Sequence, residues 1–276
     1  METNVCWMGI YSSFILPPSS FLIMTTIAIT GKGGTGKTTV SALMVHWLVA
    51  NKKTPVLAVD ADSNANFNEV LGVSYSASVG GIREDARAKA GSMGGGLSKQ
   101  QFLETQVNQA LVESEGFDLV VMGRPEGPGC YCFANNVLRD VLARISRNYA
   151  FIVVDCEAGL EHLSRRTLLD VDWLVTVSDP SIRGLRTAKR VGELVDEMKT
   201  RVRRRALVVN RLAGKPGTLT DAQTLAIKES RFDRVFYLPL DEEITRMDEN
   251  GGTVKDISEE SGVYRGISEI MPKLFE

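Results

Sequence analysis

The stretch that decides the fold of this chain is Gly31-Lys32-Gly33-Gly34-Thr35-Gly36-Lys37-Thr38. It follows the apolar run Ile27–Thr30 and precedes a mostly apolar helical pattern. The stretch matches G-x-x-x-x-G-K-[ST], which forms a loop between a strand and a helix whose backbone N–H groups surround nucleotide phosphates. We expect Lys37 to reach the β- and γ-phosphates and the Thr38 hydroxyl to join a Mg²⁺ shell. The residues predicted to contact the nucleotide here are Gly33, Gly34, Thr35, Gly36, Lys37, Thr38 and Thr39.

The same stretch also fits the dinucleotide pattern G-x-G-x-x-G through Gly31, Gly33 and Gly36. Asp60 then stands where a ribose-binding acid would lie, and the alternative is a nicotinamide-dependent dehydrogenase. The run 37–39, Lys-Thr-Thr, favours the nucleoside triphosphate, because a dinucleotide-binding helix packs closely on its strand there and has no task for a charged lysine.

Short apolar runs alternate with helical patterns along the rest of the chain. Most runs are continuously apolar, which is typical of parallel strands buried on both faces. Apolar residues recur at three- and four-residue spacing over 137–145 and 182–198. We therefore predict an α/β fold with a doubly wound, mostly parallel sheet of about seven strands flanked by helices. The predicted strands are Ile27–Thr30, Val56–Asp60, Leu119–Gly123, Phe151–Asp155, Trp173–Ser178, Ala206–Asn210 and Val235–Leu238.

The 276 residues fit one large domain or two small ones. We expect a single phosphate-loop domain over 24–276, with an irregular insertion near 74–117 that contains a helix around 99–113. In residues 1–23, Pro17 and Pro18 interrupt the apolar clusters and Glu2 is the only charge, unlike a secretory signal. We interpret this segment as a mis-assigned start or a short flexible extension rather than a lipid anchor.

The composition excludes several classes of protein. Lys plus Arg number 32 and Asp plus Glu 34, a net charge of −2, which gives no support to broad nucleic-acid binding. Four cysteines are too few for a disulfide framework and fit a reducing, cytoplasmic location. No apolar run approaches the ~20 residues of a membrane span. The basic run Arg201–Arg205 is predicted to end a helix, where it would complement the helix dipole.

Acidic residues follow two of the predicted strands. Asp60 and Asp62 come at the end of one, and Asp155 ends the strand 151–155 in a Walker B arrangement. At the carboxyl edge of a parallel sheet these carboxylates would face the phosphates. We expect Asp60 and Asp155 to lie at the Mg²⁺ shell; the alternative is that an aspartate caps a helix.

A second informative stretch is Gly127-Pro128-Gly129-Cys130-Tyr131-Cys132. One Cys-x-Cys pair supplies two thiolates, whereas a closed zinc site takes four ligands. A two-fold dimer would bring Cys130 and Cys132 of both subunits together, and four thiolates suit Zn²⁺ or square-planar Ni²⁺. The alternative is two ordinary cysteines in a Gly-Pro turn. Cys156 is expected to be a small buried residue.

The phosphate loop, with its extra Lys32, resembles the deviant loop of the MinD/ParA/nitrogenase iron-protein superfamily. The stretches Asp60-Ala-Asp-Ser-Asn-Ala-Asn66, Gly127–Cys132 and Glu157-Ala-Gly-Leu-Glu-His-Leu-Ser-Arg-Arg-Thr167 make the chain resemble, more narrowly, the CooC-type ATPases. That family matures carbon monoxide dehydrogenase by helping nickel into its metal cluster; acetyl-CoA synthase maturation factors are close relatives. Ser63 departs from the proline that the superfamily often has.

This resemblance implies roles for several residues. Lys32 would cross a homodimer interface to the partner's nucleotide, and Asp62 would orient the attacking water. Asn210, Arg211 and Pro239 would line the adenine pocket, 156–159 would form a switch, and Cys130 with Cys132 would bind the metal. The implied cofactors are ATP, Mg²⁺ and interfacial Ni²⁺ or Zn²⁺, and the implied partners are a second copy of the chain and a client nickel enzyme.

Two rival functions stay open. One is an ATP-switched positioning protein that sits on membrane or DNA, although the C-terminal stretch 262–276 contains only Arg265 and Lys273 as basic residues. The other is an electron-donating iron protein whose cluster would be bridged by Cys130 and Cys156.

Overall fold

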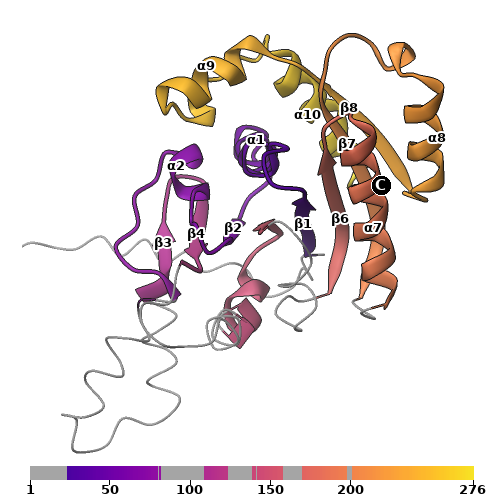
Figure 1. The fold of residues 1–276 in the computed structure, drawn as a ribbon. Helices are drawn as coiled ribbons and strands as arrows, with labels where there is room; N and C mark the ends of the chain where they lie inside the picture. The colour runs from indigo at the N-terminus through magenta and orange to yellow at the C-terminus, as the bar shows by residue number, and fades with distance from the viewer. Residues whose placement is uncertain are drawn as a thin grey trace, which may run out of the picture.

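A computed structural model describes residues 24–79, 81, 109–123, 139–140, 142–157, 170–197 and 201–276. It contains one eight-stranded sheet in the order β3-β4-β2-β5-β1-β6-β7-β8 (Figure 1). The pairings between these neighbouring strands are parallel except that of β3 with β4, which is antiparallel. Each of the seven predicted strands is present, and the α/β fold is confirmed. The strands are β1 (Thr25–Gly31), β2 (Val56–Ala61), β3 (Leu111–Glu113), β4 (Phe117–Val121), β5 (Phe151–Cys156), β6 (Val171–Ser178), β7 (Val202–Leu212) and β8 (Arg234–Pro239).

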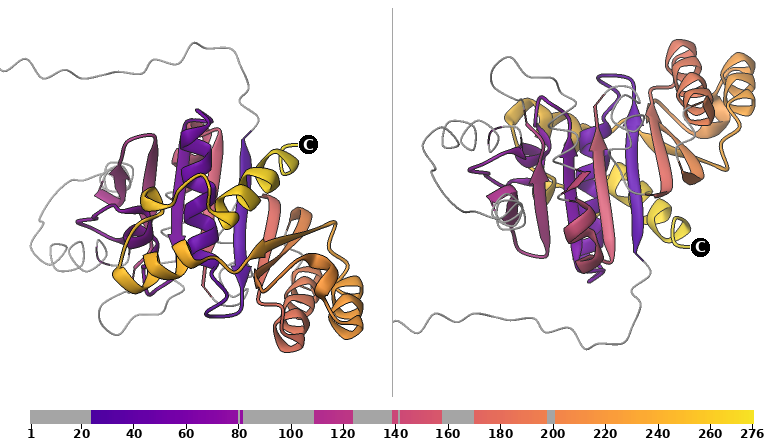
Figure 2. Two further views of the ribbon diagram at one scale, coloured as in Figure 1. Left: turned by 90° about the horizontal axis from the view of Figure 1, so that it is seen from above. Right: turned by 90° about the horizontal axis from the view of Figure 1, so that it is seen from below.

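The helices lie on both faces of this sheet (Figure 2). One face is covered by α1 and α10, whose apolar residues share a buried cluster with Ile27 and Ile29. Ala28, which points the other way along the pleat, belongs to the cluster on the opposite face, where α7 packs. The helices are α1 (Lys37–Ala50), α2 (Phe67–Leu71), α7 (Ile182–Glu197), α8 (Asp221–Glu229), α9 (Glu242–Asn250) and α10 (Gly262–Lys273). Among the helices of the described residues, none is long and apolar enough to cross a bilayer.

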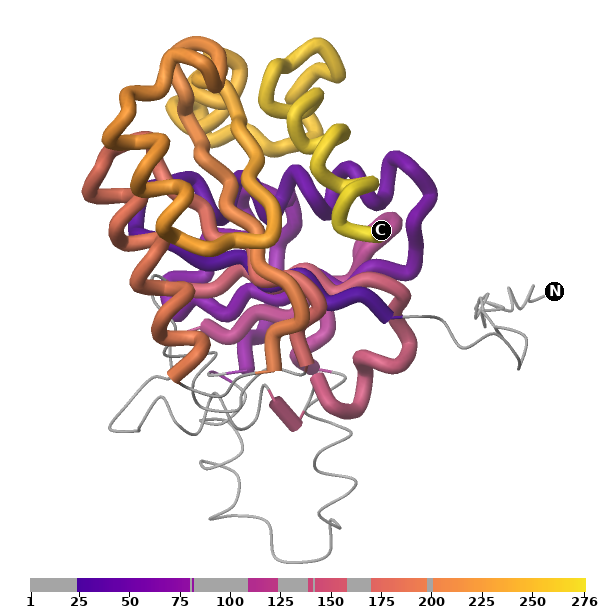
Figure 3. The backbone as a smooth tube through the Cα atoms, turned by 90° about the vertical axis from the view of Figure 1, so that its right-hand side faces the viewer, coloured from indigo at the N-terminus to yellow at the C-terminus, as the bar shows by residue number. Residues whose placement is uncertain are grey.

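The chain ends close to where the first strand begins (Figure 3). The Phe275 ring lies 5.2 Å from the ring of Phe151. Phe151 in turn stands opposite Thr25, the first residue of β1. The indole nitrogen of Trp173 also donates a hydrogen bond to the Leu274 carbonyl at 2.6 Å. The last residues of the chain are therefore part of the same core as the first strand.

The edge strand β3 corrects one prediction. A helix was expected to continue to residue 113, but Leu111–Glu113 pairs antiparallel with β4. The Ser114 N–H donates to the Phe117 carbonyl at 3.1 Å, and Gly116 takes a φ of 87° in the turn between the strands. Pairing with a preformed strand satisfies the backbone of this short segment better than one more helical turn.

The basic run Arg201–Arg205 corrects another. It does not end a helix but enters the sheet, because β7 starts at Val202 and pairs with β6. The neighbouring strand β6 and the residue just before it supply three of the four partners for these cations. The contacts are Arg201 to Asp170 at 3.6 Å, Arg203 to Asp172 at 3.0 Å, Arg204 over the Trp173 ring at 5.4 Å, and Arg205 to Asp196 on α7.

Candidate functional site

The phosphate loop connects β1 to α1, as its sequence predicts, and two of its glycines are required by their surroundings. Gly31 has a φ of 144°, and a Cβ there would lie 2.1 Å from the Val177 carbonyl oxygen on β6. Gly36 has a φ of 90°, and a Cβ would lie 2.6 Å from Nδ2 of Asn210. A side chain at either position would both strain the backbone and collide with a neighbour.

The two lysines of the loop are arranged differently. Lys37 is buried, and its Nζ donates to the carbonyl of Lys32 at 3.3 Å. Thr35 Oγ1 donates to the same carbonyl at 2.8 Å. The ammonium of Lys37 thus folds back over the loop that would hold the phosphates. Lys32 itself is exposed, so its side chain is available to a ligand or to a second molecule.

Asp155 lies beside the start of α1 and is the centre of a buried polar cluster. Thr38 Oγ1 donates to its Oδ2 at 2.7 Å, and Ser41 Oγ donates to its Oδ1 at 3.0 Å. Burial raises the pKa of Asp155 to about 6, although both hydroxyls and Lys37 act in the opposite direction. A carboxylate whose charged form burial disfavours, next to the loop hydroxyl, fits a divalent cation, which would stabilise that charge.

Asp60 stands opposite Asp155 on the neighbouring strand β2. Its Oδ1 accepts from the Asp62 N–H and its Oδ2 from the Phe67 N–H, both at 3.0 Å. Burial raises the pKa of Asp60 to about 7, and the nearby charge of Asp155 adds to the shift. With both oxygens used by the backbone, Asp60 holds the chain between β2 and α2 in place beside the phosphate loop.

Asp62 is the first residue after β2 and is half-buried. Its Oδ1 accepts from the Asn64 N–H at 2.8 Å, an Asx-type turn that orients the carboxylate. The hydrogen bond from its own backbone to Asp60 places this turn at the same edge of the sheet as the Asp155 cluster. The structure therefore brings Lys37, Thr38, Asp60, Asp62 and Asp155 to one edge, as the sequence predicts.

The end of β7 is tied to the phosphate loop. Asn210 Nδ2 donates to the Thr35 carbonyl at 2.9 Å, and Arg211 Nη1 donates to the Gly34 carbonyl at 3.1 Å. Arg211 has a φ of 58°, a left-handed conformation that is uncommon for a non-glycine residue and that the sequence does not predict. All three residues predicted for the adenine pocket line one cavity of about 300 Å³. Its lining is Gly36, Thr39, Val40, Asn210, Arg211, Pro239, Leu240, Asp241, Ile244, Thr245, Asp248, Glu249 and Val263.

Two features of the site were missed by sequence reasoning. Ser41 was not singled out, although it lies three residues after Thr38 and therefore on the same helix face, a signal that was available. Three acids line this cavity, called the base cavity below: Asp241, the N-cap of α9, and Asp248 and Glu249 within α9. No local pattern links these acids to a loop more than two hundred residues earlier, so the sequence offered no signal for them.

The predicted metal pair, Cys130 and Cys132, lies outside the described residues, as do residues 158–159 of the expected switch. Cys156 is buried as predicted, and burial raises the pKa of its thiol well above the ordinary range. In the described part of the chain, no group of three or more His, Cys, Asp or Glu side chains is placed to hold a metal ion.

Comparison with known proteins shows the family of the chain. Residues 24–208 match the family described as an AAA domain, which is more than half of the chain. The chain belongs to this AAA-domain family. The chain is 38% identical over 250 residues to an uncharacterized ATP-binding protein of Methanocaldococcus jannaschii, covering 90% of this chain and 97% of that protein. Together with the loop geometry, this family membership identifies the protein as a P-loop ATPase.

Two more relatives are informative. This chain is 27% identical over 243 residues to the carbon monoxide dehydrogenase accessory protein CooC of Rhodospirillum rubrum, covering 84% of this chain and 90% of that protein. The fold of this chain is similar to that of the septum site-determining protein MinD of Pyrococcus horikoshii OT3, which was solved as a complex with Mg-ADP. That likeness has a TM-score of 0.64 at 22% identity and covers 91% of this chain and 97% of the other.

Proposed function

We propose that this protein is a homodimeric maturation ATPase that uses ATP hydrolysis to deliver nickel to carbon monoxide dehydrogenase or to acetyl-CoA synthase. The observation that carries the proposal is where the cysteine segment begins. β4 ends at Val121, which pairs with Asp60, so the chain leading to Cys130 and Cys132 leaves the sheet at the nucleotide edge. The similarity to the CooC accessory protein supports the same assignment.

ATP would bind with its phosphates in the loop 31–38 and its base in the cavity at Asn210, Arg211 and Pro239. Lys37 would exchange its bond to the Lys32 carbonyl for one to the β- and γ-phosphates. Thr38 and Asp155, with Asp60 behind them, would hold Mg²⁺, which when bound neutralises phosphate charge. The backbone N–H groups of the loop and the start of α1 complete the phosphate site.

In hydrolysis, Asp62 would accept a hydrogen bond from a water and aim its oxygen at the γ-phosphorus. As the new P–O bond forms, the bond from that phosphorus to the β,γ-bridging oxygen breaks. ADP and inorganic phosphate leave, and the water's proton goes to phosphate. Lys32 of the partner subunit would neutralise charge that develops on the phosphates, so hydrolysis would need the dimer.

Nickel is the cargo in this proposal. Closure of the ATP-bound dimer would bring two cysteines from each subunit together and supply four thiolates, a set that suits Ni²⁺ or Zn²⁺. Loss of the γ-phosphate would remove the contacts that hold the nucleotide edge in its ATP-bound form. The dimer would then relax and release the metal to the client enzyme.

The deciding experiment is analytical ultracentrifugation with Ni²⁺, with and without ATP, followed by metal analysis of the dimer fraction. Wild type is compared with the Cys130→Ala/Cys132→Ala double variant. We expect one nickel per ATP-bound dimer in wild type and none in the variant. ATP-driven dimers that carry no cysteine-dependent metal would contradict nickel delivery and leave a positioning function of the MinD/ParA kind as the better explanation.

A second experiment isolates the dimer contact. Lys32→Ala should abolish ATP-dependent dimerisation and lower hydrolysis at least tenfold while leaving nucleotide binding in place, because the lysine would act on the partner's phosphates. Lys53→Ala is the matched control, since Lys53 is also an exposed lysine but lies beyond the far end of α1. Normal dimerisation of Lys32→Ala would refute the proposed role.

A further inference from the structure

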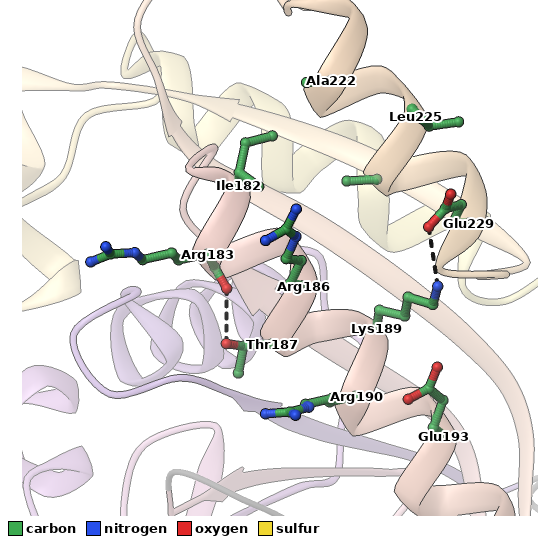
Figure 4. A pocket seen from close by; sticks show the side chains of 11 residues that line it. Ile182, Arg183, Arg186, Thr187, Lys189, Arg190, Glu193, Ala222, Leu225 and Glu229 are labelled. Atoms are coloured by element: carbon green, nitrogen blue, oxygen red, sulfur yellow. Dashed lines mark hydrogen bonds and ion pairs between the residues drawn. The ribbon is translucent and has the colours of Figure 1, made fainter.

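A second cavity lies away from the nucleotide edge, between α7 and α8 (Figure 4). It has a volume of about 690 Å³ and shares no residue with the base cavity. The inner face of α7 packs on the sheet through Leu185, Ala188 and Val191. The outer face of α7 and the facing side of α8 are left to line the groove.

Three arginines of this groove are without a partner. Arg183, Arg186 and Arg190 are all exposed, and within the described ranges none of their guanidinium groups makes an ion pair or a hydrogen bond. Among the cations that line the groove, Lys189 has a partner within the described ranges, Glu229 at 3.1 Å. In Figure 4, Arg183 and Arg190 extend to the same side of α7, while Arg186 lies between them on the side toward α8.

The contrast with β7 makes this arrangement informative. All four arginines of the run 201–205 contact an aspartate or a tryptophan within the chain. On α7, by contrast, three arginines form no ion pair with a described residue, although Glu193 lines the same groove. Arginine is more weakly hydrated than lysine, forms bidentate bonds to carboxylates and is enriched at protein interfaces.

Apolar side chains accompany these charges. Leu225 on α8 lines the groove and is 58% exposed, and Leu194 on α7 is 44% exposed. Together with Leu240 and Tyr75 they are the large hydrophobic residues that the described structure leaves most exposed. A surface that binds the phosphate backbone of a nucleic acid needs cations but not exposed leucines. A groove that binds an amphipathic peptide needs both.

We propose that the α7–α8 groove binds an acidic amphipathic helix of a partner protein. The arginines recur at i, i+3 and i+7, a stripe about 10 Å long at ~1.5 Å per residue. A helix with carboxylates at the same spacing would match them, and an apolar residue beside the carboxylates would cover Leu225. The proposal does not depend on which metal or which client enzyme the ATPase serves.

The test uses the full-length protein and two fluorescein-labelled 16-residue peptides of equal composition. In the first, glutamates occupy i, i+3 and i+7 of one helical face with leucines beside them; in the second, the same residues are spread around the helix. Fluorescence anisotropy measures the Kd of each at several salt concentrations. We expect the first peptide to bind at least tenfold more tightly than the second, and its affinity to fall as salt rises.

Variants locate the site. Arg186→Ala/Arg190→Ala should raise the Kd of the first peptide about tenfold, because two charge-assisted contacts are lost. The matched control, Arg201→Ala/Arg203→Ala, removes the same charge from ion-paired positions at the start of β7 and should leave the Kd unchanged. Leu225→Gln should weaken binding without altering its salt dependence.

Three results would overturn the proposal: no difference between the two peptides, equal losses in the two arginine pairs, or tighter binding of a 24-base-pair DNA duplex that displaces the peptide. The last would assign the groove to nucleic acid instead.

Discussion

At the scale of single residues, the phosphate loop shows how tightly backbone conformation and packing are linked. Gly33 and Gly36 lie three residues apart in the same motif, yet their surroundings differ. A Cβ on Gly33 would meet nothing within 4 Å, whereas one on Gly36 would collide with Asn210 at 2.6 Å. Asn210 cannot simply move, because its amide holds the Thr35 carbonyl.

The first prediction compares these two glycines. Gly36→Ala should lower the free energy of unfolding by about 1–2 kcal/mol, since an alanine at positive φ is strained, and should abolish ATP binding. Gly33→Ala should change the free energy of unfolding by less than about 0.5 kcal/mol. Urea unfolding and calorimetric titration with ATP measure both effects. Equal stability of the two variants would show that the collision is relieved by small movements.

The second prediction concerns the pH dependence of stability. Because the folded protein holds the proton of Asp60 up to a pH of about 7, and the unfolded chain releases it near ~4, folding takes up a proton between these values. The free energy of unfolding should therefore decrease as pH rises through this window and level off above it. Asp155, whose pKa burial raises to about 6, contributes in the lower part of the window.

The measurement is urea unfolding between about pH 5 and 6.5 in EDTA, for wild type and Asp60→Asn. We expect the variant to lose up to ~1.4 kcal/mol per pH unit of this slope, the limit for one proton. The slope is the readout, since the absolute stability also changes when an amide replaces a carboxylate that accepts two N–H groups. Identical slopes would mean that Asp60 is ionised in the folded protein.

At the scale of elements, the packing of α10 distinguishes a core helix from a free amphipathic helix. Its apolar residues belong to the same buried cluster as α1, and Ile267 is fully buried. A terminal helix that targets membranes keeps its apolar face for lipid. In this protein the apolar face of the last helix is used by the fold.

The third prediction follows from that packing. Ile267→Ala should lower the free energy of unfolding by about 2–4 kcal/mol, because it leaves a cavity between α10 and the sheet. Glu269→Ala, an exposed position on the same helix, should change it by less than about 0.5 kcal/mol. Chemical unfolding measures both values. A small loss for Ile267→Ala would indicate that α10 is only loosely attached, and ATP-dependent liposome pelleting would then be the next experiment.

At the scale of the whole molecule, the first described residues already belong to the core of the fold. Met24 packs against the buried cluster on the face of the sheet where α7 packs, and Thr25 already pairs with β5. We therefore expect the segment 24–276 to fold by itself. A protein lacking residues 1–23 should keep its melting temperature within about 2 °C and its full ATPase rate. Aggregation or loss of hydrolysis in that protein would assign the first 23 residues a structural role.

Much of the site could be predicted because it consists of short motifs at strand ends. The phosphate loop is local, and any parallel sheet brings Asp60, Asp62 and Asp155 to the edge where that loop lies. The burial of Cys156 also follows from its place after a continuous apolar strand. For these residues, the position at or after the end of a predicted strand is enough to predict where they lie in the folded protein.

The sequence by itself determined the fold class, the seven long strands and the residues at the carboxyl edge, because these depend on local patterns of apolar residues and glycines. Only the tertiary structure decided that 111–113 pairs as an edge strand and that Arg201–Arg205 enters the sheet. It alone also brought acids of α9 to the base cavity and left three arginines of α7 without a partner among the described residues. Each of these depends on which distant element lies alongside, and long-range pairing outweighs the weak local preference of a short segment.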